Sequence, residues 1–218
     1  MNIHRALTFL LSLLLFACAS TRLTSVRDPS SLTAPSYRHI LVLAPFSDLE
    51  QRTQAEGSFV DRLETLGLDA APSMGIFLPT RSYSDEDFVK ALHDARIDGI
   101  LLVSLTDAFM SQTYVPGTST TTGTVTLNGN LLNYSSTTIG VGGHQISKPR
   151  LRFELRLIRV SDGSIAWLAT SLTKGNEFAR FGSLVQSLAR ASVDDLKKNG
   201  LIDRPPNPRL KSAAAGPG

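Results

Sequence analysis

Two short, almost wholly apolar segments constrain the fold of this chain more than any other feature of its sequence. They are His39–Phe46, which ends at a proline and a phenylalanine, and Ile100–Leu105. A strand with one face in water alternates apolar and polar residues, whereas an uninterrupted apolar run of this length is typical of a strand buried on both faces. We therefore expect two strands in the centre of a covered sheet.

Helical patterns separate these two runs. Apolar residues recur at helical spacing over residues 55–66, and Gly67 ends that pattern. After a short strand at Leu68–Ala71, Ser84 followed three residues later by Asp87 resembles a capping box that opens a second helix. Two strand–helix–strand units in succession predict parallel pairing through right-handed crossovers.

The second half of the chain predicts antiparallel pairing and a final helix. Residues 151–158 alternate between apolar and mostly charged side chains, Ser161–Gly163 supplies a turn, and Ile165–Thr170 returns with the sole tryptophan, Trp167. A helix over residues 178–198 follows, and we expect Trp167 to pack against it in the core, beside Phe181 or Leu184. The complete order is β-α-β-α-β-β-β-α, an α/β (α+β) fold with a mixed sheet.

A long polar segment interrupts this pattern between two core strands. Residues 111–147 are rich in Thr, Ser and Gly, and Asn128-Gly129 near their middle favours a hairpin turn. A connection of this length is usually functional. We predict an extended Thr/Gly-rich hairpin, the arm, which contacts a partner or a neighbouring subunit, with Tyr114 and Tyr134 as candidate contact residues.

The amino terminus has the features of an export signal. Residues 1–17 begin with a basic stretch and continue as an apolar run that is too short to cross a bilayer. Leu15-Phe16-Ala17-Cys18 resembles the bacterial lipobox, which implies cleavage between Ala17 and Cys18, a diacylglycerol on the Cys18 thiol and a further acyl chain such as palmitate on its amino group. The alternative is an ordinary signal peptide cleaved after Ala19 or Ser20.

The lipobox resemblance also implies a location. In lipoproteins of two-membrane bacteria an aspartate after the cysteine retains the protein at the inner membrane, and this chain has Ala19 at that position. The implied location is the periplasmic face of the outer membrane, where several acyl chains would give effectively permanent anchoring.

Composition divides the remaining chain into three parts. Residues 18–36, rich in Ser, Thr and Pro, are predicted to be a flexible tether after the lipidated cysteine, and 203–218, rich in Pro and Ala, a disordered tail. The single folded domain is expected to span residues 37–202 and to fold without lipid, metal or cofactor.

The element order resembles that of small α/β bacterial lipoproteins related to the curli-secretion lipoprotein and to the amino-terminal domain of the Tol-Pal translocation protein. The features that resemble them are Pro45-Phe46 after the first strand, Asp98-Gly99 before a buried strand, and Asp162-Gly163 before Ala166-Trp167. In the curli-secretion lipoprotein, hairpins from many subunits form a membrane barrel. The arm of this chain has few aromatic residues and only Val125 and Leu127 as outward apolar residues in its first half, so we favour an arm outside the bilayer.

Few residues suggest chemistry. A single cysteine cannot form an internal disulfide, a zinc finger or an iron–sulfur cluster, and a net charge of +3 does not indicate a nucleic-acid groove. The histidines His39, His93 and His144 have no metal-ligand spacing, and no Gly-x-Ser-x-Gly motif occurs. We expect no cofactor, no metal and no enzymatic activity.

Arg150, Arg152 and Arg156 share one face of the predicted strand and form a basic stripe there. The stripe is either solvated or a contact for an anionic group such as a lipid headgroup, and Arg152 and Arg156 join the candidate contact residues.

The sequence leaves two function classes open. The first is a non-enzymatic, lipid-anchored envelope protein that acts through contacts with an envelope protein or with further copies of itself, in outer-membrane assembly, secretion or maintenance. The second is a periplasmic ligand-binding or hydrolytic module with a pocket at the carboxyl ends of the parallel strands, near Pro45–Asp48 and Thr106–Phe109.

Overall fold

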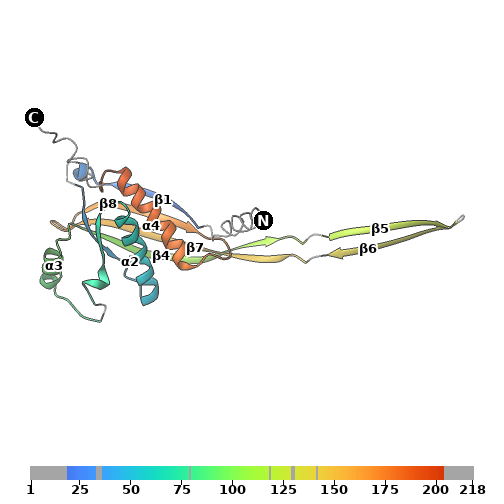
Figure 1. Ribbon diagram of the computed structural model, residues 1–218, viewed down its shortest axis with the longest axis horizontal. Helices are drawn as coiled ribbons and strands as arrows, with labels where there is room; N and C mark the ends of the chain where they lie inside the picture. Colours follow the sequence, from blue (N-terminus) through green and yellow to red (C-terminus); the bar gives the residue numbers. More distant parts are fainter. Residues whose placement is uncertain are drawn as a thin grey trace, which may run out of the picture.

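The fold is a mixed six-stranded sheet with α-helices on both faces and a long two-stranded extension at one end (Figure 1). The computed structural model describes residues 19–32, 36–78, 80–117, 119–128, 131–140 and 142–203. Ala17, Cys18 and most of the predicted tail lie outside these residues.

The strand order in the sheet is β1-β8-β7-β4-β2-β3. The strands are β1 (Ser20–Arg27), β2 (His39–Leu43), β3 (Asp69–Pro72), β4 (Gly99–Val115), β7 (His144–Arg159) and β8 (Ile165–Lys174). The predicted parallel half is confirmed, because β2 pairs in parallel with both β3 and β4. β4, β7, β8 and β1 then pair antiparallel, each with the next.

The α-helices of the described residues are α2 (Leu49–Glu64), α3 (Asp85–Asp94) and α4 (Phe181–Lys198), with short 3-10 turns η2 (Pro29–Leu32) and η3 (Ser73–Gly75). The predicted capping box is confirmed, since Ser84 Oγ accepts a hydrogen bond of 3.1 Å from the Asp87 N–H and donates one of 2.8 Å to Asp87 Oδ2. Gly67 has a φ of 80°, which allows the chain to leave α2 as predicted.

The β7–β8 turn also forms as predicted. Gly163 has a φ of 71°, a conformation that favours glycine. Hydrogen bonds from the hydroxyl and the backbone N–H of Ser164, together with Arg159, lower the pKa of Asp162 to about 2.

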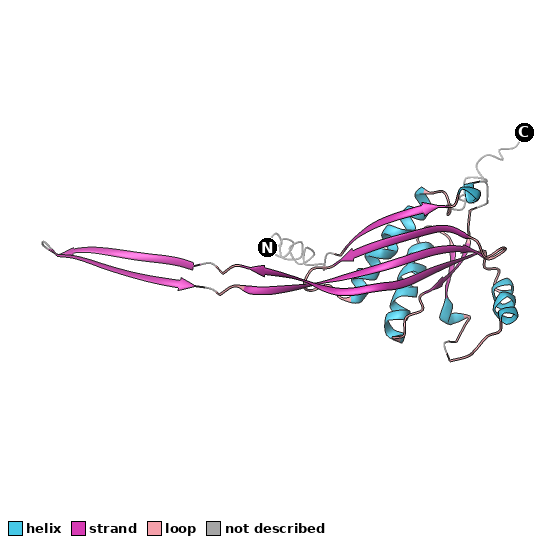
Figure 2. Cartoon of the chain, turned by 180° about the vertical axis from the view of Figure 1, so that it is seen from behind, coloured by secondary structure: helices cyan, strands magenta, loops and turns pink. Residues whose placement is uncertain are grey.

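The core lies mainly on one side of the sheet. Helices α2 and α4 lie side by side across this face (Figures 1 and 2) and bury Phe59, Leu63 and Leu188 against Val42 and Leu155. On the other face α3 covers only one part of the sheet. There Leu92 packs in a smaller cluster with Leu41, Phe77, Ile97 and Ile100. The rest of that face, over β7, β8 and β1, carries exposed or half-buried side chains.

The predicted tether is wrong for residues 20–27, because β1 is part of the sheet. All eight of its residues pair with β8, from Ser20 opposite Lys174 to Arg27 opposite Trp167. Its exposed and half-buried residues alternate, and the Oγ1 of Thr21 lies 3.0 Å from both Thr173 Oγ1 and Ser187 Oγ. The segment is too polar to form a core by itself, but the free edge of β8 supplies its backbone partners. The domain therefore begins at Ser20, before the expected start at Tyr37.

The core position of Trp167 is confirmed, since its side chain is fully buried. Its indole Nε1 donates a hydrogen bond of 2.9 Å to Asp195 Oδ2, near the carboxyl end of α4. The expected neighbour Phe181 instead packs at the other end of α4, where its ring lies 6.1 Å from that of Phe46. The expectation of Phe181 as a neighbour is wrong, because the positions of Phe181 and Asp195 are about four helical turns apart, whereas the other candidate, Leu184, belongs to the same buried cluster as Trp167.

We predict that Trp167→Ala lowers the free energy of unfolding by about 3–5 kcal/mol, because it removes a large buried side chain and leaves Asp195 without its indole partner. The matched control is Leu168→Ala on the same strand, because Leu168 is 38% exposed. Its expected cost is less than about 1 kcal/mol. Urea unfolding followed by circular dichroism measures both, and equal losses would contradict the core position of Trp167.

Candidate interaction surface at the arm

The predicted arm is confirmed as an extended hairpin. β4 and β7 pair without interruption beyond the sheet as far as Val115 opposite His144, and β5 (Ser119–Asn128) then pairs with β6 (Leu131–Gly140). Figures 1 and 2 show the arm as a slender ribbon that projects from one end of the domain. The outer half of the arm therefore lies far from the helices.

β5 and β6 form a separate two-stranded sheet in which each pairs with the other alone. A ribbon of two strands has two edges, and each edge presents backbone N–H and C=O groups that have no partner in the ribbon. A two-stranded hairpin is also marginally stable in water unless it packs against something else. The arm therefore has the form of a docking element for another polypeptide strand.

A β-bulge in β4 determines which way the side chains at the arm root point. We use arm root for residues 107–115 of β4 and 145–152 of β7. The register shifts between Leu105 and Asp107, and Thr106 Oγ1 donates a hydrogen bond of 3.1 Å to the carbonyl of Arg152. Beyond the bulge the even-numbered residues of β4 point to the side of the helices, because Ala108 pairs with buried Leu151.

The bulge leaves apolar side chains exposed on both faces of the arm root. Phe109, on the open face of the sheet, is 40% exposed, and Met110 and Tyr114, on the helix side, are 60% and 62% exposed. The ring of Tyr114 lies against Gly143, where any side chain would collide with it. Tyr114 is thus exposed as a contact residue would be, whereas the side chain of Tyr134 lies outside the described part and stays a prediction.

The structure separates the three arginines of the predicted stripe. They do share the open face, where Arg150 is opposite Phe109, Arg152 opposite Asp107 and Arg156 opposite Leu102. Arg156 is paired with Glu154 at 2.5 Å and Arg150 donates to the carbonyls of Pro149 and Gly175, whereas Arg152 is exposed and its guanidinium lies 5.5 Å from the ring centroid of Phe109.

Sequence reasoning missed Phe178. The loop between β8 and α4 is held to the arm root by a 3.0 Å hydrogen bond from the Gly175 N–H to the Pro149 carbonyl. Phe178 in this loop precedes α4 and is 74% exposed, although the helical pattern placed it inside the helix. Its exposure depends on where the helix begins, which the periodicity of apolar residues does not define.

The pocket of the alternative expectation lay at the carboxyl ends of the parallel strands, and a buried carboxylate occupies those of β2 and β3 but not the Thr106 part. Glu56 of α2 is fully buried and accepts four hydrogen bonds. Their donors and lengths are Ala44 N–H (3.1 Å), Arg52 Nε (3.0 Å), Ser73 Oγ (2.6 Å) and Met74 N–H (3.2 Å). These groups tie α2 to the ends of β2 and β3, so this carboxylate has a structural role.

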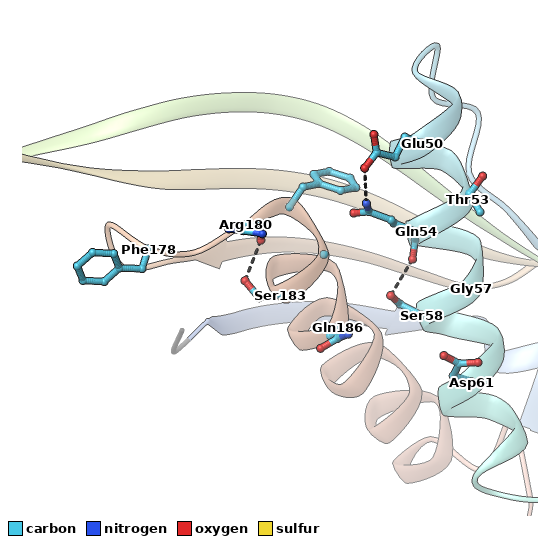
Figure 3. Close-up of a pocket in the computed structure, with 12 residues that line it drawn as sticks. Glu50, Thr53, Gln54, Gly57, Ser58, Asp61, Phe178, Arg180, Ser183 and Gln186 are labelled. Atoms are coloured by element: carbon cyan, nitrogen blue, oxygen red, sulfur yellow. Dashed lines mark hydrogen bonds between the residues drawn. The ribbon is translucent and has the colours of Figure 1, made fainter. Parts of the chain in front are cut away.

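A groove lies between α2 and α4 (Figure 3). It has a volume of about 800 Å³, and the polar side chains along it bond to their own helices: Gln54 Nε2 donates to Glu50 Oε1, Ser58 to the Gln54 carbonyl and Ser183 to the Arg180 carbonyl. A smaller cavity of about 370 Å³, lined by Thr106, Arg152 and Thr170, lies on the open sheet face. Neither arrangement places a nucleophile beside a base.

His39 and His93 lie apart from the arm root, whereas the backbone of His144 lies at its outer end, opposite Val115. His39 is at the start of β2, with 3.8 Å between its ring nitrogens and the carboxylates of Asp69 and Asp98, all of which are partly exposed. His93 lies in the last turn of α3, and the side chain of His144 lies outside the description. The described residues contain no cluster of three or more His, Cys, Asp or Glu side chains that could hold a metal ion.

A search of the described helices for a segment long and apolar enough to span a membrane found none.

No family model and no curated protein matches the chain. Among solved structures, it is similar to a PelC dodecamer from Paraburkholderia phytofirmans, with 13% identity over 81% of this chain and 97% of that one and a TM-score of 0.47. It is also similar to lipoprotein GNA1162 from Neisseria meningitidis, with 15% identity over 74% and 99% of the two chains and a TM-score of 0.39. At these identities neither structure assigns a function or an assembly to this chain.

We predict that Glu56→Ala lowers the free energy of unfolding by about 3–5 kcal/mol, because it leaves Arg52 and two backbone N–H groups without their buried acceptor. Glu50→Ala, on the exposed first turn of the same helix, is the control and should change stability by less than about 1 kcal/mol. Thermal unfolding measures the difference. An unchanged midpoint for Glu56→Ala would show that the carboxylate is dispensable for the fold and reopen this end of the sheet as a functional site.

Proposed function

We propose that this chain is a lipid-anchored envelope protein of the periplasmic face of the outer membrane, and that it acts through protein contacts made by the arm and its root. It has no enzymatic step in this proposal. Its place is in outer-membrane assembly, secretion or maintenance, and its partner is an envelope protein or a further copy of the same chain. The observation that carries the proposal is the arm, a ribbon whose two edges pair with no other strand of the described residues.

The arm supports a role in contacts for two physical reasons. Its edge groups can add to a strand of another polypeptide, since main-chain hydrogen bonds supply affinity without a particular sequence. Its root adds exposed Phe109, Met110 and Tyr114, which can supply apolar area at such a contact. A domain that bound only a small ligand would have no use for a ribbon that extends so far from its core.

The anchor is supported by the sequence, in which Cys18 is the only cysteine and follows Ala17 at the end of an apolar run. The occupied carboxyl ends of β2 and β3 favour a contact protein over a hydrolytic or ligand-binding module, because Glu56 fills the place where the crevice of an open α/β sheet usually lies.

We predict that Cys18→Ser abolishes membrane anchoring, because a hydroxyl does not replace the thiol that accepts the diacylglycerol. Fractionation of cells and incorporation of labelled fatty acid measure this. The folded domain should be retained, as judged by circular dichroism of the purified variant. Labelled lipid on the Cys18→Ser chain would overturn the anchor.

We predict that replacing residues 112–147 by Asn-Gly abolishes co-purification of the partner or of further copies. Ser111 and Lys148 are opposite each other in the β4–β7 register, so a two-residue turn can join them. The stability of the domain should change by less than about 1 kcal/mol, because the removed residues add nothing to the core and loop length has a weak cost.

Mass analysis of complexes purified in mild detergent measures this second prediction. The control is a chain with both Tyr114→Ser and Met110→Ser, which keeps the ribbon but removes two apolar contacts, and which should weaken the association less than removal of the whole ribbon. Partner binding that survives removal of the arm would refute the proposed role of the arm.

A further inference from the structure

Strand β1 places the start of the described chain at the arm end of the domain. Its residue Ser20 lies opposite Lys174, the last residue of β8, and Lys174 lies opposite Arg150 on β7. Arg150 in turn lies opposite Phe109 at the arm root. The register therefore brings the beginning of β1, the end of β8 and the arm root to one end of the sheet.

The anchor proposed above is close to the same end. Cys18 precedes Ser20 by two residues, and two residues span at most about 7 Å when fully extended. If a flexible tether separated them, the orientation of the domain would be free. Because β1 begins at Ser20, a lipid on Cys18 would hold this end of the sheet within about 7 Å of the lipidated residue, and therefore close to the membrane surface.

The charges of this end suit a membrane with anionic headgroups. We define the arm-side end as residues 20–22, 107–115, 145–152 and 172–180. It contains six basic residues, Arg22, Lys148, Arg150, Arg152, Lys174 and Arg180, against two acidic ones, Asp107 and Glu177. The strand ends and turns at the opposite end, residues 27–32, 36–39, 94–99 and 159–164, contain four basic and four acidic residues.

Apolar side chains accompany these cations. Phe109, Met110, Tyr114 and Phe178 are the large apolar residues of the arm-side end that are exposed by 40% or more. Figure 3 shows Phe178 pointing away from the helices, toward the side on which β4 and β7 converge into the arm. Aromatic side chains beside Lys and Arg are typical of surfaces at the level of lipid headgroups, where rings and cationic groups both find partners.

We propose that the arm-side end is a membrane contact: it lies on the headgroup layer of the membrane that holds Cys18, with its cations facing lipid phosphates and Phe178 at the interface. This inference rests on the proposed lipid anchor and adds an orientation to it. In this orientation the long axis of the sheet is inclined to the membrane, so that the arm runs along the headgroup surface outside the bilayer, and the neutral end with the β7–β8 turn lies farther from the membrane.

Site-specific labelling of the lipidated chain tests this orientation. Cys18 is the only cysteine, and in the mature lipoprotein its thiol is bonded to lipid, so a cysteine introduced elsewhere is the only free thiol. We would label Phe178→Cys at the arm-side end and Ser161→Cys at the opposite end with a polarity-sensitive fluorophore. Both side chains are exposed, and the second substitution is nearly isosteric.

The probe membranes are vesicles of phosphatidylethanolamine with phosphatidylglycerol, compared with vesicles of phosphatidylcholine. On the anionic vesicles the label at position 178 should shift to shorter wavelength and be several-fold less accessible to acrylamide than in detergent, whereas the label at position 161 should be unchanged. The label at position 178 should lose part of this protection when Arg22→Gln and Lys174→Gln are combined. It should also lose part of it at high salt in the chain that keeps both cations, because salt screens their attraction to the headgroups.

Equal acrylamide accessibility at the two positions would overturn the orientation, and equal protection on anionic and zwitterionic vesicles at all salt concentrations would overturn the role of the cations. A failure of the anchor is seen separately and first, because the chain would then not float with vesicles and Cys18 itself would react with the label.

Discussion

The antiparallel pairing of β4 with β7 is the interaction on which the rest of this structure depends. It runs from Gly99 opposite Arg159 to Val115 opposite His144. On one side it joins the parallel strands β2 and β3, and on the other it supports β8 and β1. The same two strands then continue toward the arm, so the domain core and the arm root share one continuous pair of backbones.

The bulge at Thr106 marks the change between these two roles. Before it, Leu101 and Val103 point into the core beneath α2 and α4. After it, the alternation is reversed and the helices no longer cover β4, so Met110 and Tyr114 are exposed. Without the extra residue, the side chains of the arm root would have the opposite orientation, because a shift of one residue moves every side chain to the other face.

Strand β1 restricts the orientations that the domain could adopt relative to the membrane if Cys18 is lipidated. A lipoprotein with a long tether samples many orientations, whereas the hydrogen bonds between β1 and β8 leave only one residue, Ala19, between Cys18 and the sheet. The proposed anchor would then be close to the end of the sheet that carries the basic residues and the arm. The contact surface of the arm would therefore be presented close to the membrane, where an envelope partner or further copies of the chain are concentrated.

The sequence by itself determined the elements whose signals are local. Buried strands at His39 and Ile100, the caps at Ser84 and Gly67 and the turn at Gly163 each depend on neighbours within a few residues, and the hairpin arm joins strands that follow each other in the sequence. The structure has all of them. Only the tertiary structure decided that Ser20–Arg27 is a strand, that Trp167 bonds to Asp195, and that Glu56 closes the ends of β2 and β3. Each of these depends on a partner supplied by another element of the fold, and in the case of β1 that partner lies more than a hundred residues away, because polar segments and buried polar groups are stable only where distant parts of the chain complete their hydrogen bonds.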